Sequence, residues 1–234
     1  MKSSSANSNR CRIKVCGIRD PGEAAALDAM GVDWIGFNFH PRSARYLAPE
    51  AAAPMVRALK HAVPVGVFVD LDPAEVLRII ALTGIRCVQL HGREDKAYIA
   101  KMPLPVIKAI PHDRLSDLAG LADPNALEGP KGLAPGVSPL AYFLIDTQAA
   151  PSAQAGFGGS GRTFDWGLLA KHPLPLPYFL AGGLGPQNLA EALEACAAFP
   201  PFAVDLNSKV EVAPGRKDLG KVQAAMDIVR NRIA

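Results

Sequence analysis

Two polar side chains that end apolar runs of the sequence could carry proton transfer. Cys16 closes the run of residues 13–16, and Asp146 closes the run of residues 142–146. A thiolate can act as a general base and a carboxylic acid as a general acid when burial and neighbouring charges bring their pKa values toward neutrality. Spacing alone favours the plainer interpretation, in which Cys16 is a small buried apolar residue and Asp146 caps a loop.

Two later loops have a composition suited to binding an anion. Gly182 and Gly183 follow one apolar run, and Asp205, Asn207 and Ser208 end or follow the next one. Glycine lets the backbone approach a ligand closely, and backbone N–H groups in such loops commonly hold phosphate. The alternative is a pair of tight turns. Because both loops show the pattern, we favour a phosphate site.

Three further features are weaker candidates for a functional role. Arg45 has the forked guanidinium that pairs with a carboxylate, although Arg42 is an equal candidate by chemistry alone. His91 could orient a neighbour or satisfy a loop backbone. The segment 156–163 matches G-x-G-x-x-G and nearly matches a P-loop, but no strand leads directly into it. We therefore interpret it as a flexible flap.

Composition and charge exclude several classes of protein. The 234 residues carry a net charge of +3 with dispersed Lys and Arg, and only 6% are aromatic, so no nucleic-acid partner is expected. No apolar run approaches the roughly 20 residues of a membrane helix. The Ser- and Asn-rich start does not form a secretory signal, so we expect a cytoplasmic protein without a membrane partner. The four cysteines fit no zinc pattern, so no metal is expected and the thiols should be free.

Eight short apolar runs alternate with helical patterns along the chain. The runs cover residues 13–16, 34–37, 65–69, 87–90, 106–110, 142–146, 178–181 and 202–205. Helices are expected from Pro21, Pro49, Pro73, about Glu94, about Asp113, Pro186 and about Asp218.

The order and apolar character of these elements predict the fold class. Runs too apolar to alternate are typical of a parallel sheet covered by helices. Eight strand–helix units in this length predict an α/β protein, a single-domain (β/α)8 TIM barrel. A doubly wound open sheet, which usually has fewer strands, is the alternative. Residues 1–10 are expected to be a disordered tail and residues 11–234 the barrel domain, with a mobile connection over residues 123–139.

Strand alternation predicts where the candidate acid and base point. Ile13 and Val15 suit the side of the strand that faces the helices, which leaves Lys14 and Cys16 on the barrel side. Active sites of such barrels lie at the carboxyl ends of the strands, often with phosphate on the loops after strands seven and eight. Cys16 is therefore expected at the mouth of the barrel.

In this order, the segments resemble the phosphoribosylanthranilate isomerase family of tryptophan biosynthesis. The resemblance extends from about Arg12 to the C-terminus and rests on matching stretches at residues 14–18, 36–46, 65–69, 88–92, 144–147, 158–166, 181–184 and 204–208. Each stretch is modest alone, and together in this order they are highly specific.

The resemblance implies a reaction and roles for named residues. The reaction is a cofactor-free Amadori rearrangement of N-(5-phosphoribosyl)anthranilate to 1-(2-carboxyphenylamino)-1-deoxyribulose 5-phosphate, an intramolecular oxidoreduction of the aldose–ketose type. By the same resemblance, Cys16 is the general base, Asp146 is the general acid and Arg45 holds the anthranilate carboxylate. The only partner expected is a small phosphosugar, and the protein is expected to be a monomer or a homodimer.

This chain departs from the family's pattern at two places, and two other functions are alternatives to the one implied. The family often has Gly where this chain has Lys209, which would cause strain if that position needs a positive φ. The segment 123–139 is longer than expected. The alternatives are another phosphosugar isomerase or lyase, and a barrel that only binds a phosphorylated metabolite. Mere binding, however, would need neither Cys16 nor Asp146.

Overall fold

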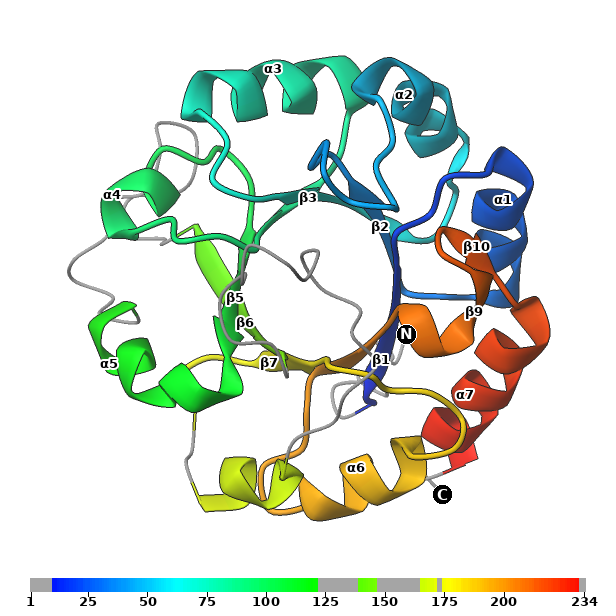
Figure 1. The fold of residues 1–234 in the computed structure, drawn as a ribbon, viewed down its shortest axis with the longest axis vertical. Coiled ribbons are helices and arrows are strands. Elements are labelled where there is room, and N and C mark those ends of the chain that lie inside the picture. Colours follow the sequence, from blue (N-terminus) through cyan, green and yellow to red (C-terminus); the bar gives the residue numbers. More distant parts are fainter. Residues whose placement is uncertain (1–9, 122–138, 147–164, 172–173, 232–234) are drawn as a thin grey trace, which may run out of the picture.

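Eight parallel strands form a closed barrel in this protein. A computed structural model describes residues 10–121, 139–146, 165–171 and 174–231. The strands follow one another around the ring in chain order, and β1 pairs with β8 to close it (Figure 1). They are β1 (Arg12–Cys16), β2 (Trp34–Asn38), β3 (Val63–Phe68), β4 (Cys87–Leu90), β5 (Val106–Pro111), β6 (Leu140–Asp146), β7 (Tyr178–Leu180) and β8 (Ala203–Leu206). The predicted (β/α)8 barrel is confirmed, and the doubly wound alternative is wrong.

Helices form an outer layer around this ring, as Figure 1 shows. The α-helices are α1 (Pro21–Met30), α2 (Pro49–Ala58), α3 (Pro73–Thr83), α4 (Lys96–Ile99), α5 (Leu118–Leu121), α6 (Leu189–Ala195) and α7 (Leu219–Asn231). The 3-10 helices are η1 (His112–Asp117), η2 (Trp166–Lys171) and η3 (Ser208–Val210). Residues 1–9 of the expected tail, residues 123–138 of the long connection and the glycine-rich segment 156–163 lie outside the described residues.

Local sequence signals set the bounds of the longer helices. The Asp20 side chain accepts a hydrogen bond from the Glu23 N–H, as an N-cap does, and Gly31 ends α1 with a φ of 82°. Helix α3 repeats the arrangement, with Asp72 as its N-cap and Gly84 at a φ of 75°. These caps explain why the predicted starts at Pro21 and Pro73 agree with the structure.

Three α-helices begin later than predicted. The helix expected from about Asp113 begins as the 3-10 helix η1 and continues as α5 only from Leu118. In the other two cases, polar side chains hold the preceding loops. Helix α4 starts at Lys96 rather than near Glu94, because the Glu94 carboxylate accepts hydrogen bonds from the N–H groups of Asp70 and Gly92. Helix α6 starts at Leu189 rather than Pro186. There the Asn188 side chain accepts from the Gly185 N–H and donates to the Gly183 carbonyl, which fixes a turn before the helix.

A two-stranded hairpin after β8 was not predicted. Its strands β9 (Glu211–Ala213) and β10 (Arg216–Lys217) pair antiparallel, and Gly215 turns the chain with a φ of 79°. The strands are three and two residues long, too short to show an alternating pattern. The hairpin follows β8 and contributes two buried ionic side chains, Glu211 and Lys217, next to Asn207 at the carboxyl end of that strand.

Buried apolar side chains form two layers, one between the strands and the helices and one inside the barrel. Ile13 and Val15 belong to the layer between strands and helices, as the alternation predicted. The interior is filled by a separate cluster made of Trp34, Val65, Cys87, Ile107, Ala109, Leu144, Phe179, Ala181 and Ala203. Trp34 meets Tyr142 and Phe179 edge to face, with ring centroids 5.7 and 5.4 Å apart. This cluster fills the middle of the barrel, and the candidate residues Cys16 and Asp146 lie beyond it at the carboxyl ends of β1 and β6.

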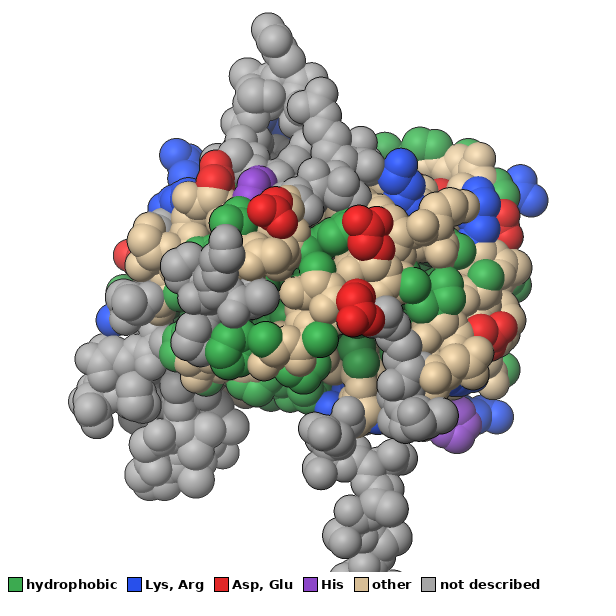
Figure 2. Space-filling view, turned by 90° about the horizontal axis from the view of Figure 1, so that it is seen from below, with side chains coloured by type: hydrophobic (Ala, Val, Ile, Leu, Met, Phe, Trp, Pro, Cys, Tyr) green, Lys and Arg blue, Asp and Glu red, His purple; other side chains and the backbone are tan. Residues whose placement is uncertain are grey.

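The surface has no continuous basic patch among the described residues of the face seen in Figure 2, where positive and negative side chains are scattered. Within the described ranges, no helix combines the length and apolar character needed to cross a membrane.

Candidate active site

Cys16 lies at the carboxyl end of β1 and faces the barrel interior. It is 6% exposed, and its partner in the β1–β2 register is Gly36. A Cβ atom built on Gly36 would lie only 2.8 Å from the Cys16 sulfur, so the glycine leaves room for the thiol. Gly36 shares its face of β2 with Trp34, a member of the interior cluster. The inward orientation predicted for Cys16 from strand alternation is therefore confirmed. The four cysteines are free thiols.

A buried ion pair lies next to Cys16 on the same side of the barrel. Lys14, which is fully buried, donates to both carboxylate oxygens of Asp205 at 2.8 and 2.9 Å. Burial lowers the pKa of Lys14, but Asp205 and Cys16 together offset this and hold that pKa above its ordinary value. Burial raises the pKa of the Cys16 thiol, and the Lys14 ammonium acts in the opposite direction. Lys14 therefore favours the thiolate that a base requires.

Asp146 ends β6 and shares its face with Leu144, a member of the interior cluster. The carboxylate is almost buried, and its Oδ2 lies 3.4 Å from His91 Nε2. The other ring nitrogen of His91, Nδ1, lies 3.0 Å from the amide nitrogen of Gln89. With the Gln89 amide donating, Nδ1 accepts and Nε2 carries the hydrogen toward Asp146. His91, left open by sequence reasoning, thus contacts the candidate acid.

Cys16 and Asp146 lie on strands that are separated by β7 and β8 on the shorter way around the ring. Asp205 on β8 lies between them and interacts electrostatically with Asp146, which raises the pKa of Asp205 in addition to the larger effect of burial. The fold therefore brings both candidate catalytic groups and the predicted Asp205 to one mouth.

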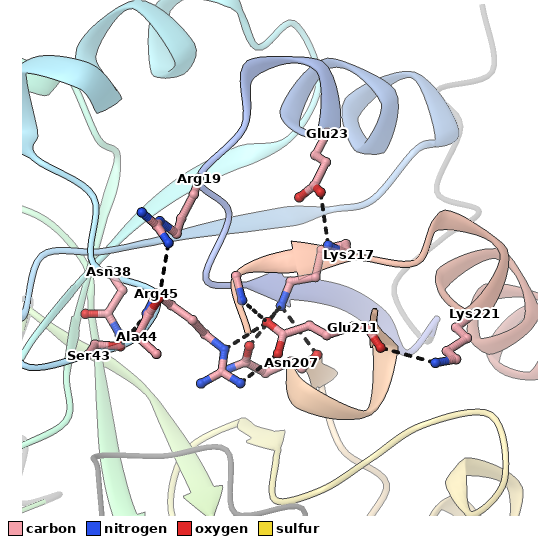
Figure 3. A network of polar contacts seen from close by, with 11 residues as sticks. Arg19, Glu23, Asn38, Ser43, Ala44, Arg45, Asn207, Glu211, Lys217 and Lys221 are labelled. Carbon is pink, nitrogen blue, oxygen red and sulfur yellow. Dashed lines mark hydrogen bonds and ion pairs between the residues drawn. The ribbon is translucent and has the colours of Figure 1, made fainter. Parts of the chain in front are cut away.

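Arg45 is buried and its guanidinium already has a carboxylate partner. Its Nε and Nη2 atoms donate to the two carboxylate oxygens of Glu211 at 2.8 and 2.7 Å. The Lys217 ammonium donates to Glu211 Oε1 at 2.6 Å and to Asn207 Oδ1 at 2.9 Å (Figure 3). Arg42, the equal candidate by chemistry, is exposed in the same loop.

Glu211 and Lys217 are the functional candidates that sequence reasoning missed. Both come from the unpredicted hairpin, and Glu211 meets Arg45 from 166 positions away in the chain. The only local cue was Pro214-Gly215, a dipeptide typical of turns, in a polar stretch.

The glycine loop after β7 adopts a backbone conformation that favours glycine. Gly182 and Gly183 adopt φ values of 87° and 64°, which side-chain-bearing residues rarely take. The β7 and β8 strands are paired, so their loops are neighbours. A Cβ on Gly185 would lie 2.7 Å from the Cβ of Lys209, which shows that the two loops pack against each other.

The loop after β8 contributes Asn207 and Ser208. Asn207 accepts a hydrogen bond from Lys217, and Ser208 begins η3, whose next residue, Lys209, packs against Gly185 of the loop after β7. The strain considered for Lys209 is absent, because Asp70 is the one non-glycine residue with positive φ in the described ranges. No group of three or more His, Cys, Asp or Glu side chains suited to a metal ion occurs in the part of the chain that the structure describes.

A (β/α)8 barrel with a buried thiol, a buried carboxylate and glycine-bearing loops at its carboxyl end defines an enzyme of the phosphosugar-barrel class. Residues 13–227 match the family model described as N-(5'phosphoribosyl)anthranilate (PRA) isomerase. The chain belongs to this family.

Relatives and solved structures of the same family cover nearly the whole chain. N-(5'-phosphoribosyl)anthranilate isomerase of Nitrosomonas eutropha is 38% identical over 223 residues, which is 95% of this chain and 98% of that protein. The Rhodospirillum rubrum protein is 37% identical, covering 93% and 97%. The phosphoribosyl anthranilate isomerase structure of Thermotoga maritima superposes with a TM-score of 0.77 at 32% identity, covering 94% of this chain and 99% of that one.

A solved structure of the family contains a bound ligand. It is a phosphoribosyl anthranilate isomerase in complex with reduced 1-(o-carboxyphenylamino)-1-deoxyribulose 5-phosphate, with a TM-score of 0.74 and 30% identity over 94% of this chain and 99% of that chain.

Proposed function

We propose that this protein isomerises N-(5'-phosphoribosyl)anthranilate to 1-(2-carboxyphenylamino)-1-deoxyribulose 5-phosphate, as an aldose–ketose isomerase of tryptophan biosynthesis that needs no cofactor. The observation that carries the proposal is the placement of Cys16 and Asp146 at one barrel mouth, in a chain that belongs to the PRA isomerase family. The reaction needs one acid and one base, and these two residues can supply them.

Asp146 is the proposed general acid for opening the sugar ring. It gives its proton to the ring oxygen while the bond from that oxygen to C1 breaks and the nitrogen lone pair forms a C1–N double bond. The product of this step is an open-chain imine that carries a positive charge. His91 Nε2, 3.4 Å from Asp146 Oδ2, supports the carboxylate that remains.

Cys16 is the proposed general base for the second step. Its thiolate removes the proton on C2, the C–H electron pair forms a C1–C2 double bond, and the imine electrons return to nitrogen. The resulting enolamine becomes the ketone when C1 gains a proton and the C2 hydroxyl loses one. Return of a proton from Cys16 to C1 and of the hydroxyl proton to Asp146 resets both groups.

The two charged ends of the substrate define the remaining roles. Arg45 is proposed to hold the anthranilate carboxylate, since it is the buried guanidinium beside Cys16. Backbone N–H groups of Gly182 and Gly183, together with Asn207 and Ser208, are proposed to hold the phosphate. Asp205 is proposed to hold the Lys14 ammonium, which favours the thiolate of Cys16. We further propose a cytoplasmic enzyme that works as a monomer or homodimer, and sedimentation of the purified protein tests the oligomeric state.

Turnover by the purified wild-type protein tests the function. The substrate is N-(5'-phosphoribosyl)anthranilate, and its conversion is followed as loss of anthranilate fluorescence. Other aldose phosphates are offered in parallel under the same conditions. Conversion of only the anthranilate substrate supports the proposal. Conversion of another phosphosugar in its place would make the chain a different phosphosugar isomerase, and tight binding without any conversion would make it a metabolite-binding barrel.

A further inference from the structure

The β9–β10 hairpin inserts one carboxylate between two buried cations. Glu211 accepts two hydrogen bonds from Arg45 and one from Lys217, as Figure 3 shows. The side chains of Arg45, Glu211 and Lys217 are 9%, 5% and 0% exposed. Lys217 is held further by the side-chain oxygen of Asn207 at 2.9 Å. The three ionic groups therefore form one buried unit, which has two positive charges, one negative charge and a net charge of +1.

The hairpin also determines which edge of the guanidinium is engaged. Glu211 contacts Nε and Nη2, the side-on edge of Arg45. A guanidinium has five N–H donors, so the end-on edge formed by Nη1 and Nη2 can still receive a second carboxylate. Arg45 also lies against the residue that follows the candidate base, because a Cβ built on Gly17 would lie 2.6 Å from Arg45 Cδ. The side chain of Arg45 is thereby held beside β1, and its guanidinium interacts electrostatically with Cys16.

The charge balance of this unit decides whether a second anion can bind. Arg45 and Glu211 alone would be neutral, and an incoming carboxylate would meet the negative charge of Glu211 in a poorly solvated place. Although burial opposes it, Arg45 and Lys217 together hold the pKa of Glu211 below its ordinary value, so the carboxylate is charged. Lys217 supplies the positive charge that offsets it.

We propose that Glu211 and Lys217 are positioning residues for recognition of the substrate's aromatic carboxylate. Glu211 orients Arg45, and Lys217 neutralises Glu211 so that the Arg45 unit keeps its net positive charge. This inference rests on the proposed function, and specifically on Arg45 as the carboxylate-binding group.

A charge-rescue experiment tests the proposal with two probes. One probe is reduced 1-(o-carboxyphenylamino)-1-deoxyribulose 5-phosphate, and the other is the same molecule without its carboxyl group. Lys217→Gln keeps a hydrogen-bonding side chain but removes the charge, and should weaken binding of the carboxylated probe roughly tenfold or more. Binding of the decarboxylated probe should change less than twofold. In turnover, KM should rise much more than kcat falls.

The double variant separates charge balance from a structural role. In Glu211→Gln/Lys217→Gln the unit regains its net positive charge, so the carboxylated probe should bind within about threefold of wild type. Lys221→Met is the matched control, since Lys221 donates to the Glu211 backbone carbonyl but is 40% exposed and pairs with Asp218. It should bind both probes like wild type. If Lys217→Gln does not fold, Lys217→Met takes its place, since it also removes the charge, and the same loss of affinity for the carboxylated probe alone is expected.

Three outcomes would overturn the inference. Lys217→Gln could weaken both probes equally, could leave both unchanged, or the double variant could bind the carboxylated probe no better than the single variant. A wild-type protein that does not convert N-(5'-phosphoribosyl)anthranilate would instead contradict the proposed function, whatever the variants bind.

Discussion

The sulfur of Cys16 occupies the space that a side chain at Gly36 would need. The two residues are partners across the β1–β2 ladder, and a Cβ on Gly36 would lie 2.8 Å from the Cys16 sulfur and 3.1 Å from its Cα. The Gly36 carbonyl also accepts the N–H groups of Gly17 and Ile18, which turn the chain directly after the thiol. One residue of β2 thus sets both the room for the thiol and the exit of β1.

Gly36→Ala should displace the thiol without unfolding the barrel. A shift of the reacting group by about 1 Å can cost roughly 100-fold in rate, so we expect kcat/KM to fall between about 10- and 100-fold. Gly220→Ala is the control, because that glycine lies in the exposed start of α7 and its added Cβ would meet only the Asp218 carboxylate at 3.2 Å. Wild-type kcat/KM in Gly36→Ala, measured on a protein with an unchanged circular dichroism spectrum, would show that the thiol needs no such room.

Sequence patterns predicted the positions of residues that depend on local periodicity. The inward orientation of Cys16 followed from the alternation of β1, and the caps at Asp20 and Gly31 followed from residue type. The partners that depend on the closed barrel could not be found in this way. Glu211 meets Arg45, and Asp205 meets Lys14, across 166 and 191 positions of the chain. Such pairings have no local signature, because only the tertiary fold brings the groups together.

Asp146→Asn should bind substrate and turn it over very slowly. The amide keeps the shape and polarity of the carboxyl group but has no proton to give to the ring oxygen. Loss of a positioned general acid costs roughly 100- to 10,000-fold, so kcat should fall by that factor while KM changes little. Asp146→Glu, which keeps an acid in a displaced position, should retain more activity. Equal kcat for Asp146→Asn and wild type would assign the acid to another group, and Asp205 would then be the next candidate.

Arg45→Ala should weaken substrate binding more than Arg42→Ala does. A charged hydrogen bond to a carboxylate contributes about 1.5–3 kcal/mol, which corresponds to a rise in KM of roughly 10- to 150-fold for Arg45→Ala. Arg42 is exposed, and its removal should leave KM within about twofold. Steady-state measurement of both variants checks the assignment, and equal KM values would mean that the carboxylate is held elsewhere.

Gly183→Asp should abolish phosphate binding at the loops after β7 and β8. A carboxylate at this position repels the anion, and the φ of 64° strains any residue with a side chain. Gly84→Asp is the matched control, because Gly84 has a φ of 75°, open space around its Cβ and a place at the end of α3. It introduces similar strain without approaching the site. Inorganic phosphate should compete with substrate in wild type and Gly84→Asp, and this competition should be lost in Gly183→Asp. Unchanged competition in Gly183→Asp would place the phosphate elsewhere.

The role of Cys16 as the general base is tested most directly by the turnover number of Cys16→Ala with N-(5'-phosphoribosyl)anthranilate. Cys16→Ala should fold and bind the reduced product analogue within a few-fold of wild type, while kcat falls by roughly 100- to 10,000-fold because no base removes the proton on C2. A kcat close to that of wild type in this variant would contradict the assignment of Cys16 as the base.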